Sequence, residues 1–321
     1  MKRYDVVALG ELLIDFTENG TSVQGNPVFE ANPGGAPCNV LAMLRKLDRQ
    51  CAFVGKVGND MFGHQLKAVA EEAGIDMSAL RMDDAIHTTL AFVKTDAFGD
   101  RDFSFYRNPG ADMMLTEDEL PLDMLRDTRV FHFGTLSMTH EAVRQATKAA
   151  VLAAKEAGAI ISFDPNLRPP LWDSLNEARA QMLWGLSQAD VVKIADNEIE
   201  FLTDTSDYEK GARLLRERFP NLRLMNVTAG ANGSYAFYGD RKMFVPSFLL
   251  GNTIETTGAG DTFCASVLNF VLERGLEGLN KGDLKQMLRF ANAAAYLVTT
   301  RKGAIRSMPE REQVEAILKE H

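Results

Sequence analysis

The chain has 321 residues, of which 45% are hydrophobic and 25% are charged, and this composition is typical of a globular protein with a large core. The 44 acidic side chains outnumber the 35 Lys and Arg, and the net charge of −9 argues against a nucleic-acid-binding protein. No apolar run approaches the roughly 18 residues of a membrane span, and residues 1–5 lack the apolar core of a secretory signal.

Cysteine and histidine patterns exclude further classes. The three cysteines, Cys38, Cys51 and Cys264, have no metal-type spacing, and the five histidines form no HExxH-like pair. A zinc enzyme is therefore not expected. An odd number of cysteines without a disulfide pattern is typical of reduced thiols, so we expect a cytoplasmic protein.

Apolar, strand-like runs alternate with amphipathic helical stretches along most of the chain. We expect strands at residues 5–9, 51–57, 130–133, 160–163, 191–194 and 222–227. Expected helices include 139–157 and 174–186, and two mostly apolar helices at 259–273 and 283–299. Apolar strands separated by helices predict an α/β fold with a mostly parallel sheet covered on both faces.

Four short segments interrupt this alternation. Residues 88–95 and 102–107 are strand-like and rich in Thr, Val, Phe and Tyr, and residues 97–100 between them are typical of a hairpin turn. With residues 13–16 and 27–30, this hairpin could form a small separate sheet that acts as a lid. The alternative is an antiparallel extension of the main sheet.

The sharpest motif is Gly258-Ala259-Gly260-Asp261, at the start of an expected helix. Without bulky side chains, backbone N–H groups can approach an anion closely, and the helix dipole favours negative charge at this end. Asp261 would lie in the first turn, where a carboxylate can take a proton from a hydroxyl that attacks a phosphoryl group. The spacing alone fits equally well a glycine-rich loop with an acidic helix start.

A second motif is Gly34-Gly35, followed by Asn39 in the next expected helix. The glycines allow close backbone approach to a ligand, and the Asn39 amide both donates and accepts hydrogen bonds. Asp15, after the first strand, is a further polar group at a strand end. These residues suit a polyhydroxylated ligand, whereas taken alone they fit a tight turn and a helix start.

The segment after the strand at 191–194 offers acidic and amide groups. Asn197 and Glu200 are three residues apart and share a helix face. Mg²⁺ keeps several waters and takes one or two carboxylates, so this pair suits a magnesium site through water. The alternative is an ordinary acidic helix N-terminus with Asp196 as its cap.

Three further features occur near strand ends. Residues 228–233, with Thr228, Gly230 and Gly233, could surround nucleotide phosphates or form a hairpin turn at Asn-Gly. Arg168 could bind phosphate, and Arg107 lies at the end of the expected hairpin, although both could be ordinary solvated charges. Because the carboxyl ends of parallel strands share one sheet edge, most of these segments should converge in space.

The order of these motifs resembles that of the ribokinase-like carbohydrate kinases, also called the PfkB family. The resemblance covers nearly the whole chain, including residues 10–15, and implies a three-layer α/β/α sandwich with a small β-sheet lid. It implies one domain over residues 1–321, with lid segments at about 12–32 and 87–112. It also implies ATP-dependent phosphorylation of a sugar primary hydroxyl, and residues 33–39, 53–63, 105–112, 162–172, 193–202 and 290–305 are most similar to members that phosphorylate fructose at its 6-hydroxyl.

The resemblance also implies roles for individual residues. Asp261 would be the base, and the N–H groups of Gly258, Ala259 and Gly260 would form an anion hole. The implied sugar-binding residues are Asp15, Gly34, Gly35, Asn39 and Arg107. The implied nucleotide-binding residues are Arg168, Lys193, Thr228, Gly230, Gly233, Asn292 and Gly303. Asn197 and Glu200 would hold Mg²⁺ through water.

Other properties of the family are expected with one departure. Glu255 stands where the family usually has Asp, near a monovalent-cation site, so activation by K⁺ is an open question. Family members are often homodimers joined through their lids. Alternatives within the family are 2-keto-3-deoxygluconate kinase and aminoimidazole riboside kinase, and a different class is a non-catalytic sugar sensor. A dinucleotide oxidoreductase is disfavoured, because residues 9–13 lack G-x-G-x-x-G.

Overall fold

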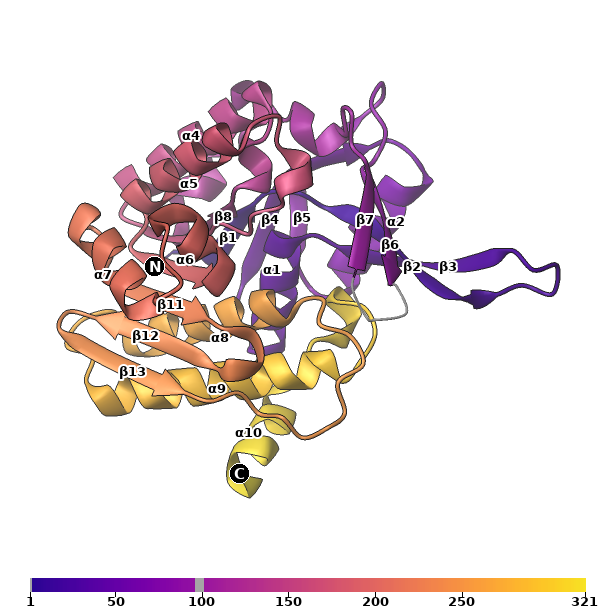
Figure 1. The fold of residues 1–321 in the computed structure, drawn as a ribbon. Helices are drawn as coiled ribbons and strands as arrows, with labels where there is room; N and C mark the ends of the chain where they lie inside the picture. The colour runs from indigo at the N-terminus through magenta and orange to yellow at the C-terminus, as the bar shows by residue number, and fades with distance from the viewer. Residues whose placement is uncertain (1, 96–100) are drawn as a thin grey trace.

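The computed structural model describes residues 2–95 and 101–321, and these form a nine-stranded central sheet with a separate four-stranded sheet beside it (Figure 1). The central order is β13-β12-β11-β10-β9-β8-β1-β4-β5. Within this sheet, among the strands that the structure describes, only the pairs β11–β12 and β12–β13 are antiparallel. The nine strands are β1 (Tyr4–Leu9), β4 (Cys51–Gly58), β5 (Asp76–Asp83), β8 (Thr128–Gly134), β9 (Ile160–Asp164), β10 (Val191–Ala195), β11 (Leu224–Thr228), β12 (Ser234–Tyr238) and β13 (Arg241–Val245). The predicted α/β fold with a mostly parallel sheet is confirmed.

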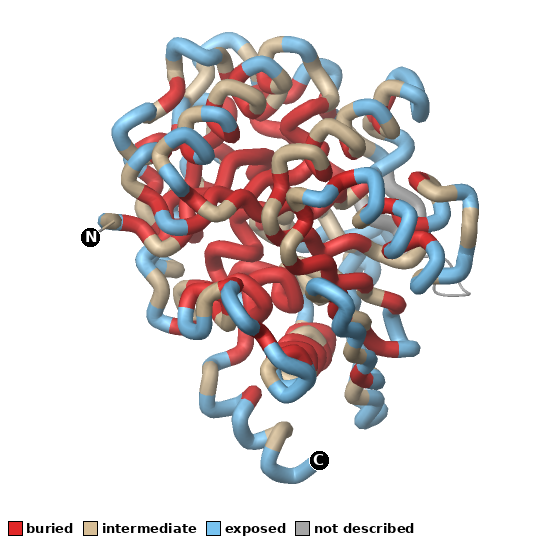
Figure 2. Tube along the Cα trace, turned by 90° about the vertical axis from the view of Figure 1, so that its left-hand side faces the viewer, coloured by how far each residue is buried: buried red, intermediate tan, exposed pale blue. Residues whose placement is uncertain are grey.

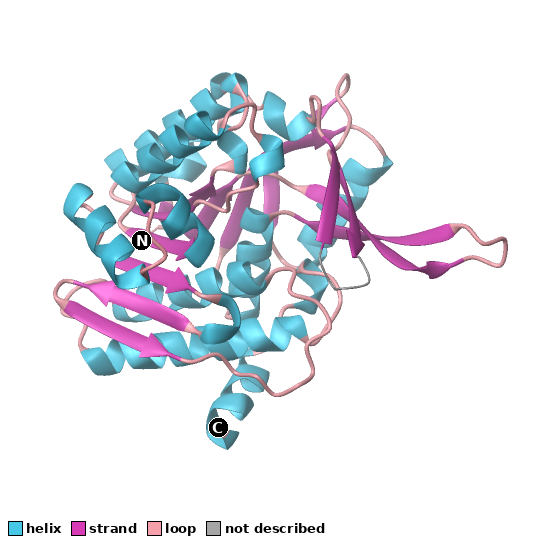
Figure 3. Cartoon of the chain, in the orientation of Figure 1, coloured by secondary structure: helices cyan, strands magenta, loops and turns pink. Residues whose placement is uncertain are grey.

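Helices cover both faces of the central sheet (Figure 3). One face carries α1 (Ala36–Lys46), α2 (Met61–Glu72), α8 (Ala259–Arg274), α9 (Lys281–Thr299) and α10 (Arg311–Glu320). The other carries α3 (Leu122–Arg126), α4 (Glu141–Glu156), α5 (Leu175–Gln188), α6 (Asp196–Thr203) and α7 (Tyr208–Arg218). Buried segments fill the interior and exposed ones lie at the periphery (Figure 2). No helix in the described part of the chain is long and apolar enough to cross a membrane.

The strands alternate between the two apolar cores. In β1, Val6 and Ala8 pack with α1 and α8, whereas Val7 and Leu9 pack on the opposite face. Successive side chains of a strand point to opposite faces, so a strand covered on both sides is apolar at every position. This is why the sequence shows continuous apolar runs, and it accounts for the three layers.

One region of the sheet breaks this apolar pattern. On the face that α8 covers, the positions near the carboxyl ends of four neighbouring strands are polar and buried. They are His132 of β8, Ser162 and Asp164 of β9, Lys193 of β10 and Asn226 of β11. Because buried polar groups are costly unless they have partners or a function, this row indicates where a site lies.

The smaller sheet, which we call the lid, has the strand order β3-β2-β6-β7. Its strands are β2 (Leu13–Thr21), β3 (Pro27–Gly34), β6 (Leu90–Thr95) and β7 (Arg101–Tyr106). The β2–β3 hairpin extends away from the body as a long arm (Figure 1). The predicted separate sheet is thus confirmed, and the alternative of an extended main sheet is wrong. The expected turn at 97–100 lies outside the described residues.

Candidate active site

Two cavities meet at the start of α8. The lid cavity, of about 320 Å³, lies between the lid and the carboxyl ends of the strands. The α9 cavity, of about 310 Å³, lies beside α9 and the loop that connects β11 to β12. Thr256 and Gly260 line both cavities, so the loop that leads into α8 forms the boundary between them. A molecule in each cavity could therefore exchange a group across this loop.

The backbone at the boundary is suited to an anion. Gly258 has φ 78, a left-handed conformation that glycine adopts without strain, and α8 begins at the next residue. The first N–H groups of a helix have no carbonyl partner within that helix. At Gly260 a Cβ atom would lie 3.2 Å from Lys193 Nζ, so the ammonium group lies close to the same backbone. The predicted anion hole therefore has a cation beside it.

Asp261 lies in the first turn of α8 and lines the lid cavity, and a residue of α1 fixes its position. Asn39 Nδ2 donates a hydrogen bond to Asp261 Oδ2 at 2.8 Å. Burial raises the pKa of Asp261, while the Asn39 hydrogen bond and the positive charges of Lys193 and Arg168 oppose the rise. A carboxylate with a raised pKa is a stronger base than an ordinary surface aspartate. Asn39 Oδ1 is buried and has no hydrogen-bond partner among the described residues, so it can accept one from a ligand.

A buried ion pair lies beneath this boundary. Lys193 Nζ is 3.2 Å from Asp164 Oδ2, and both side chains are buried. Burial alone would lower the pKa of Lys193, but the negative charges of Asp164, Glu198 and Asp261 outweigh it and raise the pKa above its ordinary value. Burial raises the pKa of the Asp164 carboxyl, against the opposing charge of Lys193. The neighbouring carboxylates thus favour the ammonium form of Lys193 at this site.

Of the two residues expected to hold magnesium, only one lines a cavity. Asn197 lines the lid cavity, whereas Glu200 is exposed and lines neither cavity. The acidic residue of this segment that lines the cavity is Glu198, whose carboxylate accepts hydrogen bonds from the Leu167 and Ala195 N–H groups, each at 2.7 Å. Sequence reasoning missed Glu198, although a glutamate three residues after a helix cap is a known N-terminal signal.

Arg107 does not reach the lid cavity. Its guanidinium donates to Asp112 Oδ2 at 2.6 and 2.9 Å, to Thr139 Oγ1 at 2.9 Å and to the Leu136 carbonyl at 2.9 Å. The side chain is 2% exposed, and its partner Asp112 is equally buried. Phe105, two residues earlier in β7, lines the cavity instead. Because β7 ends at Tyr106, Arg107 lies beyond the strand, where the alternation of strand side chains no longer fixes its direction. Arg107 therefore belongs to the wall behind the cavity.

The other predicted residues are divided between the two cavities. Asp15, Gly35, Asn39, Arg168 and Lys193 line the lid cavity. Gly34 lies against this group, since a Cβ there would be 3.0 Å from Asp15 Oδ2. Thr228, Gly230, Gly233 and Asn292 line the α9 cavity, together with Ala259.

Gly303 and Glu255 lie outside both cavity linings but contact each other. Gly303 N donates to Glu255 Oε2 at 3.1 Å, and Thr257 Oγ1 donates to the other carboxylate oxygen. Glu255 thus links the loop before α8 to the loop after α9. In the described part of the chain, no group of three or more His, Cys, Asp or Glu side chains is placed to hold a metal ion.

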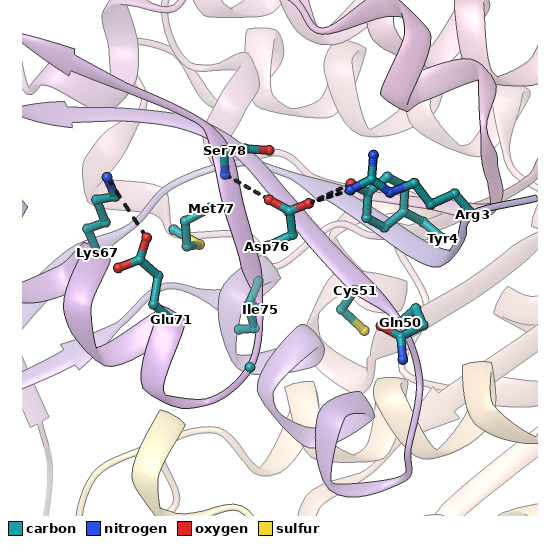
Figure 4. Close-up of a pocket in the computed structure, with 11 residues that line it drawn as sticks. Arg3, Tyr4, Gln50, Cys51, Lys67, Glu71, Ile75, Asp76, Met77 and Ser78 are labelled. Carbon is teal, nitrogen blue, oxygen red and sulfur yellow. Dashed lines mark hydrogen bonds and ion pairs between the residues drawn. The ribbon is translucent and has the colours of Figure 1, made fainter.

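A third hollow lies elsewhere and shares no lining residue with these cavities. It is about 520 Å³ in volume and lies near β5, with Arg3, Tyr4, Asp76, Lys67 and Glu71 in its lining (Figure 4). Its charges satisfy each other, because Arg3 pairs with Asp76 at 3.8 Å and Lys67 with Glu71 at 3.9 Å. None of the predicted site residues lines this hollow.

A helix start whose backbone suits an anion, with a partly buried carboxyl group in its first turn and a cavity on either side, is the arrangement that a phosphoryl-transfer enzyme needs. Residues 3–311 match the pfkB family carbohydrate kinases, and the chain belongs to this family of sugar kinases. It is 43% identical to the probable fructokinase-2 of Arabidopsis thaliana, over 95% of this chain and 92% of that protein. It is 42% identical to fructokinase-1 of Zea mays, over 96% of each.

Solved structures agree with this assignment. The fructokinase of Xylella fastidiosa with bound ATP superimposes with a TM-score of 0.90 at 30% identity, covering 99% of both chains. A double mutant of the Vibrio cholerae fructokinase with fructose, ADP and potassium ion bound has a TM-score of 0.87 at 29% identity, again covering 99% of both chains. The ribokinase-like fold predicted from the sequence is thus confirmed.

Proposed function

We propose that this protein transfers the γ-phosphoryl group of ATP to the 6-hydroxyl of D-fructose, giving fructose 6-phosphate and ADP. The observation that carries the proposal is the partly buried Asp261 carboxyl at the boundary of two cavities, within hydrogen-bond distance of Asn39. The fructokinase relatives support fructose as the acceptor, since similarity to them extends over nearly the whole chain.

In the proposed reaction, Asp261 takes the proton of the sugar hydroxyl as its oxygen attacks the γ-phosphorus. The new oxygen–phosphorus bond forms while the bond to the ADP oxygen breaks, and ADP leaves with the electron pair. The N–H groups of Gly258, Ala259 and Gly260 stabilise the charge on the transferring group. Lys193 adds a fixed positive charge beside them. Closure of the lid would exclude water, which otherwise competes as the acceptor.

The sugar would lie in the lid cavity. Asp15, Gly34, Gly35 and Asn39 would hold its hydroxyl groups, and the unpartnered Asn39 Oδ1 supports this role. Arg107 lies outside the cavity lining and would not contact the sugar directly. Its guanidinium holds the Leu136 carbonyl, and Leu136 lines the cavity, so Arg107 would act as a positioning residue for that wall.

The nucleotide would lie in the α9 cavity, with its phosphates toward Gly260. Thr228, Gly230 and Gly233 would surround it, Asn292 would lie beside the base, and Arg168 would lie near the transferring group. Gly303 would act in the adjoining loop. Its N–H group donates a hydrogen bond to Glu255, which supports a role in fixing this loop next to the cavity.

The residues present suit a Mg²⁺ ion held mainly by phosphates and water. Asn197 and Glu198 supply one amide and one carboxylate at the cavity, and Mg²⁺ typically takes few protein ligands. Asn197 and Glu200 would hold the ion through water, as the sequence predicts, and Glu198 would add a carboxylate at the cavity itself. When bound with ATP, Mg²⁺ neutralises charge on the phosphate oxygens. Activation by K⁺ is a further proposal, since Glu255 supplies a carboxylate near the phosphate loop.

A homodimer joined through the lid is also proposed. The lid carries an aromatic cluster. The ring of Phe16 stacks on that of Phe92 with 4.8 Å between the ring centroids, and the Tyr106 ring packs edge-on against Phe92 with 5.3 Å between the centroids. Tyr106 is 64% exposed, so part of this apolar cluster faces solvent and would be buried by a second lid. The three cysteines are buried free thiols, which fits the reducing cytoplasm that we propose as the location.

The test is ADP release with Mg·ATP against fructose, 2-keto-3-deoxygluconate, ribose and aminoimidazole riboside, with Asp261→Asn as the blank. We expect fructose to give the highest kcat/KM, and Asp261→Asn to lower kcat about 10²–10⁴-fold while ATP still binds. A higher kcat/KM for the keto acid or a riboside would refute the fructose assignment. Bound ATP without turnover of any sugar would favour a sugar sensor.

A further inference from the structure

Glu11 is a buried acidic residue for which the reaction described above has no use. It lies between β1 and β2, is 3% exposed and lines the lid cavity. It also lines a very small cavity behind the first, together with His132 and Asp164. A carboxyl group that is both buried and in contact with a ligand cavity is costly unless a partner compensates it.

The backbone partners of Glu11 fix its position. Its Oε1 accepts a hydrogen bond from the Ala36 N–H at 2.9 Å, at the first residue of α1. Its own backbone N–H also favours the ionised carboxylate. At Gly35 a Cβ would lie only 2.3 Å from the Glu11 carbonyl oxygen, so the glycine loop packs directly on this residue. Glu11 is thus held rigidly against the loop proposed to bind the sugar.

The charges around Glu11 do not include a cation of its own. Within residues 2–95 and 101–321, Glu11 forms no ion pair. Arg107 lies nearby but is paired with Asp112, while Asp164 pairs with Lys193 and His132 is neutral because burial lowers its pKa to about 3. Burial raises the pKa of Glu11 to about 7, with smaller opposing effects from its backbone hydrogen bonds.

We propose that Glu11 is a further sugar-binding residue, whose carboxylate accepts a hydrogen bond from a hydroxyl group of the bound sugar. An ionised carboxylate can accept about four hydrogen bonds, and the backbone groups named above use only part of this capacity. The hydroxyl groups of a sugar are donors that can enter the cavity. The inference rests on the proposed sugar substrate and adds a contact that binds and selects it.

The proposal predicts a proton release that a purely structural residue would not give. A donor that binds the ionised form favours that form, so sugar binding expels the proton from those molecules in which Glu11 is neutral. Near pH 7 this amounts to up to about half a proton per sugar, since Glu11 has a pKa of about 7.

The experiment is calorimetric titration of the full chain with fructose, without ATP, in buffers of different ionisation enthalpy. We expect proton release in the wild type and in Asp164→Asn, and its loss in Glu11→Gln. Glu11→Gln keeps an oxygen that can accept from the Ala36 N–H, and we expect KM for fructose to rise about 10- to 100-fold with a smaller change in kcat. Thermal unfolding checks that each variant is folded.

The outcomes distinguish a wrong substrate from a wrong role for Glu11. If the wild type does not bind fructose, the proposed substrate is wrong. If it binds fructose with no proton exchange or with proton uptake, or if Asp164→Asn abolishes the release, the role of Glu11 is refuted while the substrate stands. Should Glu11→Gln fail to fold, Glu11→Asp gives the second comparison, because a shortened carboxylate should weaken fructose binding and leave ATP binding unchanged.

Discussion

Asn39 Nδ2 donates a hydrogen bond to Asp261 Oδ2 across 2.8 Å, and this bond joins two residues that are 222 positions apart in the chain. It links α1 to the first turn of α8. The base of the proposed reaction is therefore oriented by the same side chain that offers its other amide atom to the sugar.

Removal of this bond should change the pH dependence of the reaction. The Asn39 hydrogen bond lowers the pKa of Asp261 against the effect of burial, so Asn39→Ala should raise that pKa further. Asp261 must be ionised to act, and the acidic limb of the kcat/KM profile should therefore move to higher pH. At neutral pH we expect a roughly ten-fold fall in kcat, for one lost hydrogen bond to a charged group. An unmoved acidic limb would contradict the pairing.

The Lys193–Asp164 pair should contribute to both stability and rate. Lys193→Met leaves a buried carboxyl group unpaired, and we expect a loss of about 3–5 kcal/mol in the free energy of unfolding. In the double variant Lys193→Met/Asp164→Asn, stability should largely return but kcat should stay low, because the cation at the anion hole is missing. Urea denaturation and initial rates measure the two effects.

An exposed pair provides the control for that experiment. Lys67 and Glu71 lie 3.9 Å apart on the surface of α2, so Lys67→Met should change stability by less than about 1 kcal/mol. If Lys193→Met/Asp164→Asn recovered full kcat, Lys193 would contribute to stability but not to the rate.

Gly35→Ala should disrupt the loop that packs on Glu11. Gly35 has φ 137, and its Cβ would lie 2.3 Å from a backbone oxygen that cannot move freely. Gly158→Ala is the matched control, because that glycine has φ 80 but nothing within 4 Å of its Cβ position. Both should lose about 1–3 kcal/mol through backbone strain. Gly35→Ala should lose more because of the contact with the Glu11 carbonyl oxygen, and it alone should raise KM for the sugar. Equal sugar KM values in the two variants would exclude this role of Gly35.

His132 should make the protein less stable in mild acid. Burial lowers its pKa to about 3, well below the value of about 6.5 in the unfolded chain. Between these values the unfolded state binds more protons, so stability falls as the pH drops through this window, by up to about 5 kcal/mol in all. Urea titrations from pH 6.5 to 4 should therefore show a weaker pH dependence for His132→Gln than for the wild type. The exposed His64→Gln should behave as the wild type, and identical slopes in all three proteins would refute the prediction.

The sequence predicted the fold well where burial on both faces left a clear pattern. Continuous apolar runs identified β1, β4, β8, β9, β10 and β11, and small residues before an apolar helix identified the start of α8. The strands β5 and β13 were not predicted. They lie at the two edges of the sheet, where one side is less covered and polar residues interrupt the apolar run.

The candidate site was harder to predict, because the sequence does not show which way a side chain points at the end of an element. Phe105 lies in the edge strand β7 and Arg107 just beyond its end, yet Phe105 lines the cavity and Arg107 is buried behind it. Glu198 lines the cavity and Glu200 does not, because a helix turns by about 100° per residue. Glu11 and Asp164 gave a weaker signal, as acidic residues at or just after the ends of apolar strands.

The shared boundary of the two cavities has a consequence for inhibitor design. Thr256 and Gly260 line both, so the two cavities adjoin at a single loop. A single compound with a sugar alcohol at one end and adenosine at the other, joined by a short phosphate chain, could fill both cavities at once. Once one half is bound, the other half is present at a high effective concentration near its own cavity. The linked compound should therefore bind far more tightly than either half alone. Molecules of this kind would distinguish this chain from enzymes whose donor and acceptor sites are separated.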